Sequence, residues 1–143
     1  MPAGNSLVLH KRLNDSETGR QVALFVGETE THPSTCGLAL AVVGLDGELI
    51  AFGAHASCPS LPRQLAQRKA WSALRFRRST AKLAQEVEAG TLRLAIFNDA
   101  RLLAMPGGAP IIVDGITVGG VGVSGLPPEL DAEMAERFIA RLL

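Results

Sequence analysis

The sequence predicts an α+β domain in which an antiparallel sheet carries helices packed on its faces. Two turns predict the sheet: Asp46-Gly47 and Asp114-Gly115 each lie between apolar runs, and Asp-Gly in that setting is a strong hairpin signal. The third observation is helical. Apolar residues recur three or four positions apart near both ends of the chain and between the two hairpins, which predicts amphipathic helices there.

In the first half of the chain we expect a short strand, a helix capped by Asp15 or Ser16 and ending near Glu30, and two paired strands: Ser6–His10, 16–30, Cys36–Val43 and Glu48–Ala54. In the second half we expect two helices, a strand or irregular segment, the second hairpin and a closing helix: Leu61–Arg77, Thr80–Ala89, Leu92–Phe97, Met105–Gly125 and Asp131–Leu143. Ser79 is the expected cap of the second of these helices, and Gly90 its end. Asp131 is interpreted as the cap of the closing helix rather than as a catalytic residue.

Size and composition indicate one domain spanning residues 1–143. A chain of this length buries about 70% of the surface that it exposes when unfolded. Lys and Arg number 14, as do Asp and Glu, so the net charge is zero and no overall field attracts nucleic acid or an anionic membrane. Aromatic residues are only 4%, without tyrosine, which argues against a base-stacking surface.

The same composition predicts a cytoplasmic protein with neither a nucleic-acid nor a membrane partner. No secretory signal is visible at the N-terminus, and no apolar run is long enough to span a bilayer. Two cysteines are too few for a disulfide framework.

The second hairpin is unusually rich in glycine. Glycine weakens strands, and it is tolerated where a bulge, a neighbouring backbone or a ligand must approach closely. We therefore expect this hairpin to form one wall of a site. Gly120–Gly125 also matches the dinucleotide pattern G-x-G-x-x-G, but too few residues follow it to complete a βαβ unit, so the nucleotide interpretation is set aside. The glycines in or beside the strands are Gly107, Gly108, Gly119, Gly120, Gly122 and Gly125.

Three features of the sequence are candidates for a functional role, and each also has a purely structural interpretation. Lys69 lies on an apolar helical stripe, where it either extends to the rim or points into a pocket that would lower its pKa. Thr80 stands at a helix start, where its hydroxyl either caps the helix or faces a ligand. A basic cluster is either a solvated face or a patch for an anionic group such as a carboxylate: Arg63, Arg68, Lys69, Arg75, Arg77, Arg78 and Lys82.

The histidines and cysteines have spacings that metal ligands use. His32 precedes Cys36 by four residues, and His55 precedes Cys58 by three. If folding joined the two pairs, they would form a Cys₂His₂ site; the alternative is two loop histidines and two small buried cysteines. We predict no metal site.

Three segments together resemble a known family: Val42–Ile50, then Arg68–Ala73 with Ser79-Thr80, then Pro106–Gly125 with Asp131 after it. They resemble the GlcG/HbpS-like family, which includes the C-terminal domain of PduO-type cobalamin proteins, over about residues 36–140. The resemblance implies a profilin-like or roadblock-like fold with helices on both faces of the sheet, assembly into dimers, tetramers or octamers, and an association with haem.

The resemblance also implies site residues. The threonine that ligates haem in a relative corresponds to Thr80, and the family's Lys-Ala pair to Lys69-Ala70. After the first hairpin the family has an Arg-Met-Asp-Gly-Ala-like segment, whereas this chain has Gly53–Cys58, with His55 in place of the arginine and aspartate. The ligand-binding residues expected are Thr80, Gly107, Gly108, Pro110 and Ser124.

Three functions follow. The first is a small-ligand-binding protein that holds haem or another planar or anionic ligand beside the glycine-rich hairpin. The second is a cofactor-free isomerase, lyase or cyclase acting on a small organic acid, with Lys69 or His55 as the acid or base and glycine amides holding an oxyanion. The third is a structural homo-oligomer that scaffolds a pathway partner.

Overall fold

The computed structural model of the chain describes residues 6–8 and 11–143. Its helices and strands follow in the order α1 (Asp15–Glu30), β1 (Ala39–Gly44), β2 (Leu49–Ala54), α2 (Ser60–Phe76), α3 (Thr80–Glu88), β3 (Gly108–Val113), β4 (Ile116–Ser124) and α4 (Pro128–Leu142). Two short 3₁₀ helices, η1 (Pro33–Thr35) and η2 (Leu94–Phe97), lie in the connections. No helix in the described part of the chain is long and apolar enough to cross a bilayer.

The four strands form one antiparallel sheet in the order β2-β1-β4-β3, so both hairpins contribute adjacent pairs and β1 joins β4 at the centre. The register places Ala41 opposite Phe52 on one side and opposite Gly122 on the other. The turn between β3 and β4 has positive φ at both central residues, 52° at Asp114 and 78° at Gly115, as the sequence predicted.

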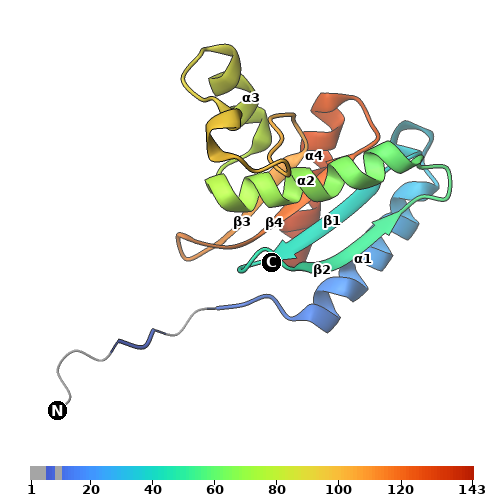
Figure 1. The fold of residues 1–143 in the computed structure, drawn as a ribbon. Coiled ribbons are helices and arrows are strands. Elements are labelled where there is room, and N and C mark those ends of the chain that lie inside the picture. Colours follow the sequence, from blue (N-terminus) through green and yellow to red (C-terminus); the bar gives the residue numbers. More distant parts are fainter. Residues whose placement is uncertain (1–5, 9–10) are drawn as a thin grey trace.

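Helices cover both faces of the sheet, which confirms the predicted α+β fold (Figure 1). Because side chains alternate along a strand, Leu40 and Val42 of β1 face α1 and α4, whereas Ala39 and Ala41 face α2. On the first face the rings of Phe25 and Phe138 meet edge to face, with their centroids 5.4 Å apart.

Two glycines of β4, Gly120 and Gly122, let α2 pack directly on the strand. A Cβ on Gly122 would overlap the carbonyl oxygen of Ala66, and a Cβ on Gly120 would overlap that of Ala70. Both carbonyls belong to α2, so the backbone of the helix lies directly on β4. Of the three reasons for glycine in these strands, a neighbouring backbone is the one that the structure shows at these positions.

The starts of two helices, α1 and α4, differ from the predictions, and the residues at their N-termini explain why. Asn14, one residue earlier than expected, caps α1: its side chain accepts a hydrogen bond from the backbone N–H of Glu17 at 2.9 Å. The closing helix begins at Pro128, because proline suits a first helical turn, so Asp131 lies inside the helix and is not its cap.

Three other predicted elements can be compared with the structure. Ser79 caps α3 as predicted, its hydroxyl accepting from Lys82 N at 3.2 Å. Within the predicted strand or irregular segment Leu92–Phe97, residues 94–97 form η2. Of the predicted strand Ser6–His10, residues 6–8 have no regular structure and the rest lies outside the described residues.

Candidate functional site

Lys69 is buried and ties α2 to β4 and α4. Its side chain is 1% exposed, and its Nζ donates to Asp131 Oδ2 at 3.0 Å, to the Val123 carbonyl at 3.0 Å and to Ser124 Oγ at 3.3 Å. An ammonium group has three protons, so all its donors are used. Of the two alternatives for Lys69, the one in which it extends to the rim is therefore wrong, and the group that it meets inside the protein is a carboxylate.

Burial and attraction oppose each other in this pair. Burial lowers the pKa of Lys69 and raises that of Asp131 to about 6, while the attraction between the two charges acts against both shifts. Asp131 Oδ1 also accepts from the Leu126 N–H at 3.1 Å, which fixes the chain just before α4. A Cβ on Gly107 would meet the Lys69 side chain, so glycine at this position leaves room for the lysine.

His55 is fully buried beyond the end of β2. Its Nδ1 accepts from the backbone N–H groups of Gly37 at 3.1 Å and Leu38 at 3.2 Å, so the ring proton is assigned to Nε2. Nε2 donates to the Val26 carbonyl at 3.1 Å and lies 3.0 Å from Thr29 Oγ1. Both nitrogens thus hold the segment before β1 against α1.

Thr80 is also enclosed. Its Oγ1 accepts from the Gly108 N–H at 2.7 Å, and the residue has no exposed surface. Gly107, Gly108 and Ser124 are buried as well, and Pro110 is half-buried in β3. The structure therefore groups Lys69 with Ser124 and pairs Thr80 with Gly108, but none of the residues predicted as catalytic or ligand-binding lines either pocket described below. Only the basic cluster predicted from the sequence contributes to these linings, through Arg68, Arg75 and Arg77. Their catalytic and ligand-binding roles stay predictions.

The predicted metal-ligand spacings do not produce a cluster. Cys36 is exposed, with its Sγ 3.3 Å from Ser57 Oγ, while Cys58 is buried. His55 already uses both ring nitrogens on the protein itself. Within residues 6–8 and 11–143, no three His, Cys, Asp or Glu side chains gather in a way that could hold a metal ion.

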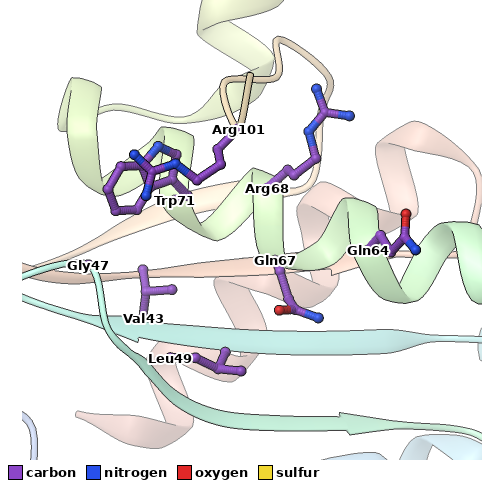
Figure 2. A pocket seen from close by; sticks show the side chains of 8 residues that line it. All are labelled: Val43, Gly47, Leu49, Gln64, Gln67, Arg68, Trp71 and Arg101. Atoms are coloured by element: carbon purple, nitrogen blue, oxygen red, sulfur yellow. The ribbon is translucent and has the colours of Figure 1, made fainter. Parts of the chain in front are cut away.

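An open pocket lies instead between α2 and the β1–β2 hairpin (Figure 2). We call it the tryptophan pocket; its volume is about 280 Å³. Val43 and Leu49 lie on its strand side, Gln67 points toward the strands, and Arg68 and Arg101 extend on the opposite side (Figure 2). Its lining consists of Val43, Gly47, Leu49, Gln64, Gln67, Arg68, Trp71 and Arg101.

Trp71, the single tryptophan of the chain, is fixed on several sides. Its Nε1 donates to Asp99 Oδ2 at 2.9 Å, and the guanidinium of Arg101 lies over its ring at 3.6 Å from the centroid. A Cβ on Gly47, which has a φ of 85°, would overlap the indole edge, so only glycine fits that turn without displacing the ring. The indole is thus a preformed wall of the pocket.

The two arginines of this pocket differ in how they are paired. Arg101 is bound to Asp99 through Nε at 3.0 Å, and this contact is the main cause that lowers the pKa of Asp99 to about 2. Arg68 donates from Nη2 to the Leu102 carbonyl at 3.1 Å, but it has no carboxylate partner among the described residues. Its Nε is buried, and of the buried side-chain polar atoms described it alone lacks a hydrogen-bond partner. Arg68 therefore supplies the uncompensated charge and an unused donor.

Arg68 belongs to the basic cluster predicted from the sequence, whereas Trp71 and Arg101 were not among the predicted site residues. A lone tryptophan within an arginine-rich helix was the available signal. Nothing local connects Arg101 to that helix, because the connection after α3 brings it back over α2 (Figure 1).

The family model described as haem degrading protein HbpS-like matches residues 16–140. The chain belongs to the HbpS-like family. A curated relative, protein GlcG of Escherichia coli (strain K12), is 33% identical over 98 residues, covering 68% of this chain and 72% of GlcG.

Solved structures show the same fold as this HbpS-like chain. Klebsiella pneumoniae protein ORFY superposes with a TM-score of 0.86 at 21% identity, covering 99% of this chain and 97% of that one. The structure described as a PduOC:heme complex superposes with a TM-score of 0.72 at 23% identity, covering 87% of this chain and 88% of that one. At these identities the likeness shows the fold alone.

Proposed function

We propose that this HbpS-like chain is a small-ligand-binding protein that holds a flat, anionic ligand in the tryptophan pocket. The observation that carries the proposal is Arg68, a lining residue of this pocket: its guanidinium has no carboxylate partner among the described residues, and its buried Nε has no hydrogen-bond partner. An unsatisfied buried donor costs free energy unless a ligand or water accepts from it. A carboxylate oxygen is the strongest acceptor for this group.

The rest of the lining supports a flat ligand. Trp71 offers a rigid aromatic wall, and Val43 and Leu49 offer apolar contact on the strand side. Gln64 and Gln67 place amide groups along α2, where they can bind polar atoms at the edge of a ring. Pockets of this type bury an apolar body and orient it with a few polar groups.

Haem is the specific candidate that the family suggests, since a relative of similar fold is described in complex with heme. The tryptophan pocket meets two of its needs, an aromatic wall and an arginine for a propionate. It does not meet the third, because its eight lining residues include no histidine, cysteine, methionine or tyrosine to ligate iron. Its volume of about 280 Å³ also admits one edge of a porphyrin rather than the whole ring.

Ligation by Thr80, which the family resemblance implies, would require its hydroxyl to become accessible, because the residue has no exposed surface and its Oγ1 is held by the Gly108 N–H. The residues present therefore fit a flat carboxylate better than an iron-ligated haem. The enzyme alternative needs Lys69 or His55 to reach a substrate, and both side chains are enclosed and fully hydrogen-bonded.

The test uses the fluorescence of Trp71 as an internal probe, with isothermal titration calorimetry as a second readout. The ligands are 4-biphenylcarboxylate, protoporphyrin IX and haemin. We expect binding of the flat carboxylate to the wild type and at least tenfold weaker binding to Arg68→Gln, because a charge-assisted hydrogen bond is lost.

Arg93→Gln is the matched control, since Arg93 is an exposed arginine that lines neither pocket. Equal binding of haemin and protoporphyrin would indicate that iron is not ligated. If no ligand binds the wild type, or if Arg68→Gln binds as the wild type does, the proposal is wrong.

A further inference from the structure

We infer that the ligand of the tryptophan pocket is an elongated dicarboxylate whose second acidic group binds Arg75 and Arg77 in an adjoining pocket. This inference rests on the proposed function and names the ligand class of the same site. It comes from the shape and charge of a second pocket, the arginine pocket, of about 500 Å³. That pocket is lined by Leu45, Leu74, Arg75, Arg77, Ile112, Gly115, Ile116 and Thr117.

The two pockets follow one side of α2. Positions 64, 67, 68 and 71 line the first pocket and positions 74 and 75 the second, and this three-or-four spacing places residues on the same helical face. The β1–β2 hairpin borders both, with Val43 and Gly47 in the first lining and Leu45 in the second. Arg75 joins them directly, because its guanidinium lies 5.2 Å from the centroid of the Trp71 ring.

Charge is segregated along this face. The chain as a whole has zero net charge, yet the linings of the two pockets include four arginines and neither aspartate nor glutamate. Arg101 is compensated by Asp99, as described above, which leaves Arg68 at one end and Arg75 and Arg77 at the other.

Two acidic residues adjoin lining residues of the arginine pocket in sequence, but neither forms an ion pair with Arg75 or Arg77. Asp46 is bound to Arg12 at 2.9 Å, and Asp114 is bound to Lys11 at 2.6 Å. Over the chain as described, the Arg77 side chain has no hydrogen-bond or ion-pair partner. Arg77 also ends α2 in the left-handed conformation, at a φ of 56°, a position that glycine or asparagine usually occupies.

Helix geometry sets the length of the ligand. Arg68 and Arg75 are seven residues apart on α2, which at 1.5 Å per residue separates their positions by roughly 10 Å. Between them lie Trp71 and Leu74, so the middle of the ligand meets apolar side chains. A rigid two-ring body with a carboxylate at each end suits this arrangement, and a one-ring diacid is too short to reach both ends.

The experiment compares 4-biphenylcarboxylate with biphenyl-4,4′-dicarboxylate by isothermal titration calorimetry. Because Arg75 and Arg77 are exposed, we expect the diacid to bind the wild type about two- to fivefold more tightly than the monoacid. Arg75→Gln with Arg77→Asn should abolish that preference and leave the affinity for the monoacid within a factor of two. Asparagine is chosen at position 77 because it tolerates the left-handed conformation.

Two controls separate charge at this face from charge in general. Arg93→Gln with Arg137→Gln removes two positive charges elsewhere on the surface and should retain the preference. Terephthalate, the short diacid, should bind no more tightly than benzoate.

The outcomes distinguish this inference from the proposed function. If the monoacid binds but the diacid is not preferred, or if the preference survives in the Arg75→Gln/Arg77→Asn variant, the second subsite is wrong and the binding function stands. If neither biphenyl acid binds the wild type but a porphyrin does, the dicarboxylate inference is wrong and the binding function stands. If neither the biphenyl acids nor the porphyrins bind, both are wrong.

Discussion

The ion pair between Lys69 and Asp131 allows a stability prediction with a definite pH dependence. Lys69→Met keeps most of the side-chain volume but leaves Asp131 in a site where only the Leu126 N–H donates to it. The two side chains are 1% and 4% exposed, so water cannot replace the lost partner. Removing one partner of a buried pair costs about 3–5 kcal/mol. We expect a loss of that size in the free energy of unfolding at pH 8.

The sign of the pH effect follows from the raised pKa of Asp131, about 6 against 3.8 for the ordinary carboxyl. The folded state binds this proton more tightly than the unfolded state does, so the carboxyl favours folding most below about pH 4, and this contribution declines as the pH rises through 6. Without Lys69 the pKa of Asp131 rises further, and the carboxyl takes up a proton instead of remaining charged. The loss should therefore be smaller at pH 5 than at pH 8.

Urea unfolding of the wild type and Lys69→Met at pH 5 and pH 8 measures both quantities. Lys82→Met, at an exposed lysine of α3, is the matched control and should change the free energy of unfolding by less than about 0.5 kcal/mol. The double variant Lys69→Met/Asp131→Asn also removes the carboxylate that Lys69→Met leaves without its partner. Its free energy of unfolding at pH 8 should therefore be higher than that of Lys69→Met alone. An equal loss at both pH values, or a loss below about 1 kcal/mol, would show that the pair is not held as described.

Three other predictions test the packing and the assembly. Thr80→Ala should lower the free energy of unfolding by about 1–3 kcal/mol, because it leaves the Gly108 N–H buried without an acceptor, whereas Thr80→Ser should retain most of it; equal thermal unfolding of the two variants would contradict this. Gly120→Val should prevent folding, as judged by circular dichroism, because its Cβ would overlap the Ala70 carbonyl, whereas Gly19→Ala in α1, where a Cβ meets nothing within 4 Å, should stabilise by up to about 1 kcal/mol. Light scattering should give a multiple of 15.0 kDa, because β2 and β3 are both open sheet edges; a clean monomer would disprove the predicted homo-oligomer.

Local sequence was sufficient for most of the fold. A two-residue turn depends on conformations that few residues adopt, so Asp114-Gly115 located the second hairpin. Helical periodicity located α1 to within a residue of its ends. Ser79, directly before a helical pattern, correctly predicted the N-cap of α3. The start of α4 was predicted at Asp131 instead of Pro128. The pair Pro127-Pro128 indicates a helix boundary, but the local sequence does not decide whether the helix begins at these prolines or after them.

The candidate site was predicted less well, and Arg68 shows why. Its membership in a basic stretch of α2 was visible, but the unpartnered Nε depends on how the segment around Leu102 crosses the helix. Trp71 becomes a pocket wall only because Gly47 and Arg101, from two other parts of the chain, lie against it.

The sequence by itself determined the order of helices and strands and the position of both hairpin turns. It also indicated that another group must approach the glycine-rich strands closely. Each of these features depends on the conformational preferences of neighbouring residues. Only the tertiary structure decided what approaches those glycines, namely the backbone of α2 at Gly108, Gly120 and Gly122, and where the polar side chains lie. Lys69 meets Asp131 across 62 positions of sequence, and His55 meets backbone groups of two other segments. A lysine on an apolar stripe has the same local pattern whether it reaches solvent, a ligand or a buried carboxylate. The difference lies in contacts between residues far apart in the chain, which no local pattern records.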